Sequence, residues 1–354
     1  MELLEETILA IVPPDADAMR EAEARIDNLT MPPRALGRVC DIAIRLSGIA
    51  GRMPPPIERR TIVTMAGDHG IVDEGVSRHG REVTMQMVAN IAAGGAGVNV
   101  LGRMNGARVV VVDFGMADRD ENMVRDGLLI DKNVGKGTAN FAQGPAMNRE
   151  QACLAVERGI EMARDLADET DVFGTGEMGI GNTSPATAIA SCLTRLPVNM
   201  LCGAGTGLDN RGLANKIKVI ENGLRLNRPN PEDALDILAK VGGYEIAGIA
   251  GLILGSAACR KPVLVDGFIS TAGAMIARVL CAGAAPYMFL SHASAEPGHV
   301  IMCEWLGDEP ILNLGMRLGE GTGAAMAMNV LEASSRILSE MATFDSAGVD
   351  AKHV

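Results

Sequence analysis

The sequence is poor in aromatic and charged residues, and nothing in it resembles a basic surface. It has one Trp, two Tyr and six Phe among 354 residues, and 21% of its residues are charged. The formal net charge is −12, and no Lys/Arg-rich run interrupts it. A nucleic-acid groove requires a concentrated basic surface, so we expect no nucleic-acid partner.

Closely spaced cysteines, metal-ligand patterns and long hydrophobic runs are also missing. The seven cysteines are dispersed without a C-x-x-C pair, which is typical of reduced thiols, and the five histidines show no metal-ligand spacing. The apolar stretch Ile246–Cys259 is too short to span a bilayer, and the N-terminal MELLEETILA is too acidic for a signal peptide. We expect a cytoplasmic protein with no bound metal and no membrane association.

Six short apolar runs, each followed by a turn and a helical stretch, organise the middle of the chain. They are TIVTMAGDHG at 61, RVVVVDFG at 108, DVFGTGEMG at 171, PVNMLCGAGTG at 197, PVLVDG at 262 and PYMFLSH at 286. Apolar strands that alternate with helices are typical of a parallel sheet covered on both faces. We therefore predict an α/β fold with a doubly wound, mainly parallel sheet of about six strands.

Both ends of the chain show helical periodicity instead. One helical face carries Met19, Ala22, Ile26 and Leu29, and a stripe on the last helix carries Met326, Val330, Ala333, Ile337 and Met341. We predict that residues 1–60 and 322–354 form a small helical domain. Residues 61–321 then form a large α/β nucleotide-binding domain.

Polar and glycine residues follow every predicted strand. They are Asp68 and His69, Asp113, Gly174–Gly181, Gly203–Gly207, Asp266, and Ser291 with His292. Ligands of open parallel sheets bind beyond the carboxyl ends of the strands. This convergence predicts a binding site at that edge.

Two glycine-rich segments are suited to an anion. GTGEMGIGNTSPATA begins at Gly174, and its glycines expose N–H groups ahead of a helix N-terminus. Asn182 and Thr183 either cap that helix or contact a phosphate. GAGTGLDNRGLANK at Gly203 repeats the arrangement, with Lys216 either solvated or reaching the phosphate as a point charge.

The segment RLGEGTGAA places one carboxylate, Glu320, between two glycines at a helix start. Glu320 is either a favourable charge for the helix dipole or a base in a partly apolar pocket beside Met316 and Leu318. Burial would raise its pKa and strengthen it as a proton acceptor. The segment alone supports both interpretations equally.

Two further signatures point elsewhere but are incomplete. GTGEMG matches the dinucleotide pattern G-x-G-x-x-G, yet no acidic residue closes a second strand about twenty positions on, so we expect no cofactor. VLVDGFISTAG at Val263 looks like the signature of transferases that use phosphoribosyl pyrophosphate. Its second acid is replaced by Gly267, which disfavours a pyrophosphate donor and its magnesium.

Seven segments in order, between about residues 30 and 330, together resemble one family. They are GDHGIVDEGVS at Gly67, VTMQMVANIAAGGAGVNVL at Val83, GTGEMGIGNT at Gly174, GTGLD at Gly205, VDGFISTAGA at Val265, SAEPGH at Ser294 and LGMRLGEGTGAA at Leu314. The family is nicotinate-nucleotide–dimethylbenzimidazole phosphoribosyltransferase, of cobalamin lower-ligand synthesis. The resemblance implies a homodimer that makes α-ribazole phosphate and nicotinate from nicotinate mononucleotide and 5,6-dimethylbenzimidazole.

The resemblance also assigns roles to individual residues. It implies Glu320 as the catalytic base and Glu177 as the second carboxylate of the site. Nucleotide or phosphate contacts carry over to Gly179, Gly181, Asn182, Thr183, Gly203, Gly205, Lys216, Asp266 and Ser294. Acceptor contacts carry over to Ser77, Gln86, Met178 and Leu318.

The chain departs from the family pattern mainly at the acceptor end. Arg78-His79-Gly80 stands where relatives often have an aromatic or small residue followed by proline, which leaves the identity of the aromatic base open. Ala204, Ala293 and Asn313 also differ from the pattern. Three alternatives remain: a magnesium-dependent pyrophosphate-donor transferase, a nucleotide-binding regulatory protein without catalysis, and an NAD-binding dehydrogenase.

Overall fold

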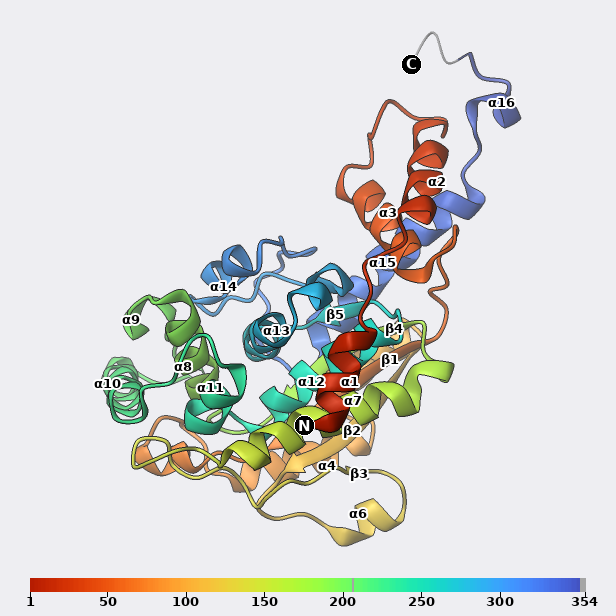
Figure 1. Cartoon of the computed structure of the whole chain (residues 1–354). Coiled ribbons are helices and arrows are strands. Elements are labelled where there is room, and N and C mark those ends of the chain that lie inside the picture. Colours follow the sequence, from red (N-terminus) through yellow and green to blue (C-terminus); the bar gives the residue numbers. More distant parts are fainter. Residues whose placement is uncertain (206, 351–354) are drawn as a thin grey trace.

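The computed structural model describes residues 1–205 and 207–350, and within them one six-stranded sheet forms the centre of the molecule (Figure 1). Its strands are β1 Arg60–Gly67, β2 Ala107–Gly115, β3 Ile130–Asp131, β4 Val172–Met178, β5 Val263–Val265 and β6 Met288–Leu290. All neighbours pair in parallel, in the order β3-β2-β1-β4-β5-β6. This order confirms a doubly wound sheet whose two halves diverge between β1 and β4.

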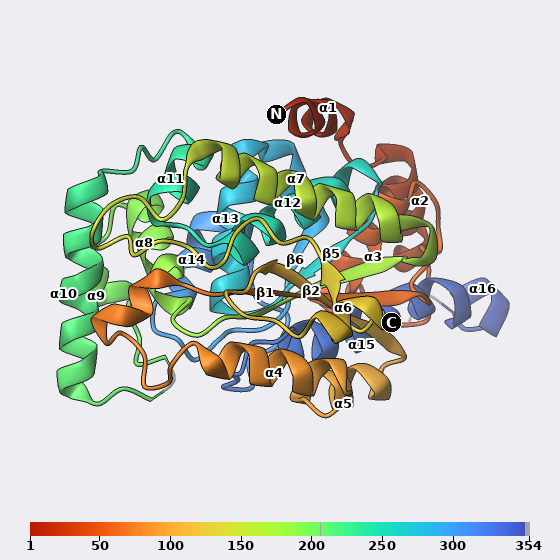
Figure 2. The same ribbon diagram turned by 90° about the horizontal axis from the view of Figure 1, so that it is seen from below.

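Helices cover both faces of the sheet, as predicted. They are α1 Glu2–Ala10, α2 Ala16–Asp27, α3 Arg38–Ala50, α4 Glu82–Ala92, α5 Gly97–Met104, α6 Glu121–Arg125, α7 Arg149–Leu166, α8 Thr183–Thr194, α9 Val198–Leu201, α10 Asn210–Asn227, α11 Ala234–Val241, α12 Tyr244–Ala258, α13 Phe268–Leu280, α14 His299–Leu306, α15 Thr322–Glu340 and α16 Phe344–Ala347. Short 3₁₀ turns occur at Gly70–Glu74, Ala167–Glu169 and Ala282–Tyr287. Helices α4, α5 and α15 lie on one face, and α7, α12 and α13 lie on the other (Figure 2).

One predicted strand is wrong. The run at 197 forms the helix α9, in which Val198 and Leu201 are buried one turn apart. Side chains three residues apart share a face of a helix, and Pro197 sets the extended backbone just before it. The missing strand is instead β3, which has only two residues and therefore carries no apolar run that the sequence could reveal.

Helices α7 and α12 meet through glycines. A Cβ at Gly251 would lie 1.9 Å from the carbonyl oxygen of Val156, and one at Gly159 would lie 2.0 Å from that of Gly248. Every residue of α12 from Tyr244 to Ala257 is buried, because the helix lies between α7 and the sheet. Within residues 1–205 and 207–350, no helix has the length and hydropathy needed to cross a bilayer.

Helices α2 and α3 meet helix α15 from the other end of the chain away from the sheet, at the upper right of Figure 1. Helices α2 and α3 share a small apolar cluster with the end of α15, made by Ala22, Ile26, Leu29, Cys40, Ala43 and Leu338. The Arg25 side chain also donates to the carbonyl oxygens of Leu338 and Met341 at 3.1 and 2.9 Å. Helix α1 instead packs on α7 and α12, and the division into two domains stays a prediction.

We expect Gly251→Ala to destabilise the protein by about 1–3 kcal/mol, since the added methyl group would force α7 and α12 apart. Helix propensity alone would favour alanine by about 1 kcal/mol, so the sign of the change tests the contact. Urea unfolding measures it. The control is Gly144→Ala, whose Cβ would meet no atom within 4 Å and which should change stability by less than about 0.5 kcal/mol. A stabilised Gly251→Ala variant would contradict the contact.

Candidate active site

A cavity of about 250 Å³ opens at the carboxyl ends of β4 and β5, beside the point where the sheet diverges. The predicted site residues that line it are Glu177, Met178, Gly179, Asn182, Thr183, Gly205, Asp266, Ser294 and Leu318. These residues come from five separate segments of the chain. The structure therefore brings together most of the nucleotide residues that the sequence indicates.

The remaining predicted residues are not part of the lining of this cavity. The Lys216 side chain contacts Thr183, which lines the cavity, and Gly203, which does not. Glu320 is buried next to Gly319, which also lines the cavity. Ser77 is half-buried, and its Oγ accepts the N–H of His79 at 3.2 Å. Gln86 is exposed on α4, and Gly181 forms the positive-φ turn before α8.

Glu320 lies in an unusual backbone turn. Its φ of +64° falls between +84° at Gly319 and +103° at Gly321, a left-handed region that costs a glutamate about 1 kcal/mol or more. The Thr64 hydroxyl donates to the Glu320 carbonyl oxygen at 2.8 Å and fixes the turn from β1. A glutamate held in a strained conformation by its surroundings is typical of a functional residue.

The Glu320 carboxylate is buried and faces the start of α5. Oε2 accepts the N–H of Val98 at 3.3 Å, so the positive end of the α5 dipole stabilises its charge. Burial raises the pKa of Glu320, and the Val98 N–H opposes this shift. The carboxylate therefore interacts with the terminus of α5 rather than that of α15, and a raised pKa makes it a stronger proton acceptor.

Asp266, directly after β5, anchors the turn that carries Glu320. Its Oδ1 accepts the N–H groups of Gly323 and Ala324 at 2.7 and 3.1 Å, and Oδ2 accepts that of Gly321 at 3.1 Å. Burial raises the pKa of Asp266, while His292 and these N–H groups lower it. Because the N–H groups belong to the first turn of α15, Asp266 sets the position of Glu320.

Glu177, at the end of β4, is the third buried carboxyl. Burial and then the charge of Asp266 raise the pKa of Glu177 to about 8. The Asn182 side chain donates to its Oε2, so Asn182 does not cap α8. Glu177 also lies against the Glu320 turn, since a Cβ at Gly319 would be 2.2 Å from Oε1.

The opposite part of the site carries a buried lysine. Lys216 is fully buried on α10, and its Nζ donates to Thr183 Oγ1 at 2.6 Å and to the carbonyl oxygen of Gly203 at 3.2 Å. Burial lowers the pKa of Lys216, which an incoming anion would reverse. Thr183 begins α8, so a cation and a helix N-terminus meet at one place.

A buried histidine–glutamate pair packs against the glycine turn of the cavity. His69 Nε2 lies 2.7 Å from Glu245 Oε1, and both side chains are buried. A Cβ at Gly179 would lie 3.3 Å from His69 Nε2, so this pair underlies the glycine turn of the cavity. Glu245 is absent from the residues predicted from the sequence, although a single acidic residue at the start of an otherwise apolar helix is a usable signal.

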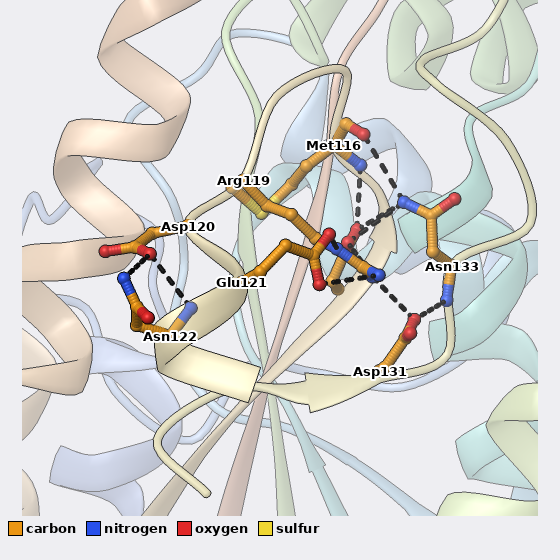
Figure 3. A network of polar contacts seen from close by, with 8 residues as sticks. Met116, Arg119, Asp120, Glu121, Asn122, Asp131 and Asn133 are labelled. Atoms are coloured by element: carbon orange, nitrogen blue, oxygen red, sulfur yellow. Dashed lines mark hydrogen bonds and ion pairs between the residues drawn. The ribbon is translucent and has the colours of Figure 1, made fainter. Parts of the chain in front are cut away.

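Asp113 lies in β2 near its carboxyl end and does not line the cavity. Its partners Met116, Arg119 and Asn133 are labelled in the network of Figure 3. Its carboxylate accepts from the Met116 N–H at 2.8 Å and from Arg119 at 3.1 Å, and the Asn133 amide donates to both oxygens. Arg119 also pairs with Asp131 of β3 at 2.8 Å. The network holds the outer strand of the sheet, and its role is structural.

A larger cavity of about 520 Å³ lies between α3 and α14. Its two arginines are already engaged, because Arg38 donates to the carbonyl oxygens of Glu309 and Pro310 and Arg45 donates to that of Pro286 and to Asp308. Among the described residues, no group of three or more His, Cys, Asp and Glu side chains is arranged to hold a metal ion.

Known proteins resemble this chain over nearly its whole length. A family model described as phosphoribosyltransferase matches residues 11–349. The nicotinate-nucleotide–dimethylbenzimidazole phosphoribosyltransferases of Syntrophotalea carbinolica and Geobacter sulfurreducens are 52% and 53% identical to it, each over 99% of both chains. The crystal structure of the enzyme of that name from Thermus thermophilus is 41% identical, with a TM-score of 0.89, covering 95% of this chain and 99% of that one.

The raised pKa of Glu177 predicts a pH-dependent stability. A carboxyl group with a folded pKa of about 8 instead of 4.5 keeps a proton that the unfolded chain loses, so stability falls as pH rises from about 4.5 to 8. Glu177→Gln removes this group. Between pH 6 and 8 we expect wild type to lose on the order of 2 kcal/mol relative to the variant, measured by urea unfolding. Parallel pH profiles would contradict the assignment.

Proposed function

This chain belongs to the phosphoribosyltransferase family, and we propose that it transfers the phosphoribosyl group of nicotinate mononucleotide to 5,6-dimethylbenzimidazole or a related aromatic base. The products would be α-ribazole 5′-phosphate and nicotinate, in the lower-ligand step of cobalamin synthesis. The full-length similarity to enzymes of that name supports the reaction. The single observation that carries it is Glu320, a buried carboxylate with a raised pKa, next to a cavity whose lining residue Thr183 is bonded to a buried lysine.

The donor fits the end of the cavity near Thr183. A phosphate there would accept hydrogen bonds from the N-terminus of α8. It would also pair with Lys216, whose ammonium group otherwise contacts only the neutral oxygens of Thr183 and Gly203. A Cβ at Gly205 would lie 3.3 Å from Lys216 Nζ, so a larger residue would intrude on this position. We therefore place the phosphate at Thr183, Gly205 and Lys216.

The acceptor would lie on the side of Glu320. One ring nitrogen of the acceptor attacks the anomeric carbon from the face opposite the pyridinium, which leaves as nicotinate. The other ring nitrogen then loses its proton to Glu320, so the positive charge created by the attack is removed. Holding the two rings on opposite sides of the sugar is the main contribution of the protein.

Four residues are proposed to contact the acceptor. Leu318 is 60% exposed and Met178 is half-buried at the cavity, so both present apolar surface to a flat ring. Ser77 and Gln86 would contact the ring from the loop before α4 and from α4 itself. Arg78 and His79, both exposed beside Ser77, make this end polar enough to change the preferred base.

We also propose a cytoplasmic homodimer. All seven cysteines are free thiols, which suits a reducing compartment. Val100 on α5 is 54% exposed and, with Leu318, lines an apolar groove of about 490 Å³. Exposed apolar surface of this kind is typical of a contact with another protein, and a second copy of the chain would bury it.

Glu320→Gln should lower kcat about 10²–10⁴-fold, because glutamine cannot accept the proton of the acceptor. The assay detects the α-linked riboside phosphate formed from nicotinate mononucleotide and a panel of aromatic bases in EDTA. The matched control is Glu340→Gln, which changes an exposed glutamate at the other end of α15 and should retain activity. Product formed only with magnesium and phosphoribosyl pyrophosphate would overturn the proposed donor.

Light scattering should give the wild type a mass twice the 37.0 kDa of one chain. Val100→Lys should shift the mass toward that of a single chain, since a charge would enter the buried interface. Leu9→Lys, at a position 84% exposed on α1, should leave the mass unchanged. A wild type of 37.0 kDa would disprove the dimer.

A further inference from the structure

One buried histidine of the cavity has no hydrogen-bonding partner among residues 1–205 and 207–350. His292 follows β6, is 1% exposed and lines the cavity described above. Neither Nδ1 nor Nε2 makes a hydrogen bond within that part of the chain. Buried polar groups in proteins are nearly always paired, so an unpaired imidazole in a cavity wall indicates a ligand.

The adjacent histidine shows that this region normally satisfies its polar groups. The rings of His292 and His299 are stacked with centroids 6.3 Å apart. His299 Nδ1 accepts the Ser294 N–H at 3.0 Å, and Nε2 lies 2.9 Å from Thr271 Oγ1. Burial lowers the pKa of His299 to about 4, so this ring is neutral and has a structural role.

The surroundings of His292 hold its ring in one place. A Cβ at Gly323 would lie 1.8 Å from Cδ2, and one at Gly267 would lie 3.2 Å from Nε2, so only glycines leave room for the imidazole. The nearest acidic oxygen is Asp266 Oδ1, 3.7 Å from Nε2, which is too long for a hydrogen bond. Asp266 already accepts the N–H groups at the start of α15.

The position of His292 in the cavity indicates which part of a ligand it meets. The lining extends from Thr183 and Gly205, the proposed phosphate end, to Gly319, the neighbour of Glu320. The reacting carbon must lie toward Glu320, so the sugar occupies the space between. His292 and Asp266 both contribute to the lining, and sugar hydroxyls are the hydrogen-bonding groups available there.

We propose that His292 binds a ribose hydroxyl of the phosphoribosyl donor through an imidazole N–H, which rests on the donor proposed above. A neutral imidazole offers one N–H, and a hydroxyl accepts it while donating its own hydrogen elsewhere. Asp266, which also lines the cavity, offers a carboxylate acceptor for that hydrogen. His292 is then a donor-binding residue, and Asp266 links the bound sugar to the turn of Glu320.

The test compares kcat/KM for nicotinate mononucleotide with that for its 2′-deoxy and 3′-deoxy analogues. His292→Ala should lower kcat/KM for the full donor about tenfold. For the analogue that lacks the bound hydroxyl, the variant and wild type should agree within about twofold. His292→Gln, whose amide retains an N–H, should recover part of the loss. Where an analogue is not turned over, its inhibition constant replaces kcat/KM.

The matched control is His299→Asn, which alters the structural histidine and should change kcat/KM for all three donors by the same factor. An equal loss for all three donors in His292→Ala would overturn the assignment, because a general distortion does not distinguish hydroxyls. Failure of the proposed function would look different: wild type would form no riboside phosphate from nicotinate mononucleotide.

Discussion

Three backbone N–H groups at the start of α15 converge on the carboxylate of Asp266, and the geometry of the site depends on this interaction. It joins the end of a central strand to the first turn of a helix that arrives much later in the chain. Three successive residues at positive φ, with Glu320 in the middle, lead into this helix start. Without the Asp266 charge, the N–H groups of a buried helix terminus would lack their acceptor.

Three buried carboxyl groups therefore meet at one edge of the sheet. Burial raises the pKa of both Glu177 and Glu320, and the negative charge of Asp266 adds to the shift of each. At Glu320 the Val98 N–H at the α5 terminus opposes this shift. Neighbouring carboxyl groups whose surroundings differ in this way are suited to different roles. Glu177 is suited to hydrogen bonding, and Glu320 is suited to accepting a proton.

The sheet, its helical covering and several residues that line the cavity could be predicted from the sequence, because strand ends and glycine turns leave local patterns. Asp266 directly follows an apolar run, and Thr183 follows a glycine-rich turn before a helix, so both have a local signal. The strand β3 and the helix α9 could not be predicted. Two residues are too few to show an alternating pattern, and the short apolar run that forms α9 has the same composition as a strand. The His69–Glu245 contact joins segments 176 residues apart, a pairing that no local pattern encodes.

Sequence motifs also could not distinguish the two histidines of the cavity region. His292 and His299 lie seven positions apart and are both buried, yet only one has its nitrogens satisfied. The difference arises from Thr271 and Ser294, which reach one ring and not the other. Such an assignment requires the tertiary structure, because it depends on which neighbours fail to make contact.

Helix α15 connects the Glu320 turn to the apolar cluster of α2 and α3 at its other end. Its 19 residues span about 28 Å at 1.5 Å per residue. A rotation of this helix about its first turn would therefore move its two ends by very different distances. A tilt of about ten degrees about Gly321 would move the far cluster by about 5 Å, whereas Glu320 itself would move by a small fraction of that distance.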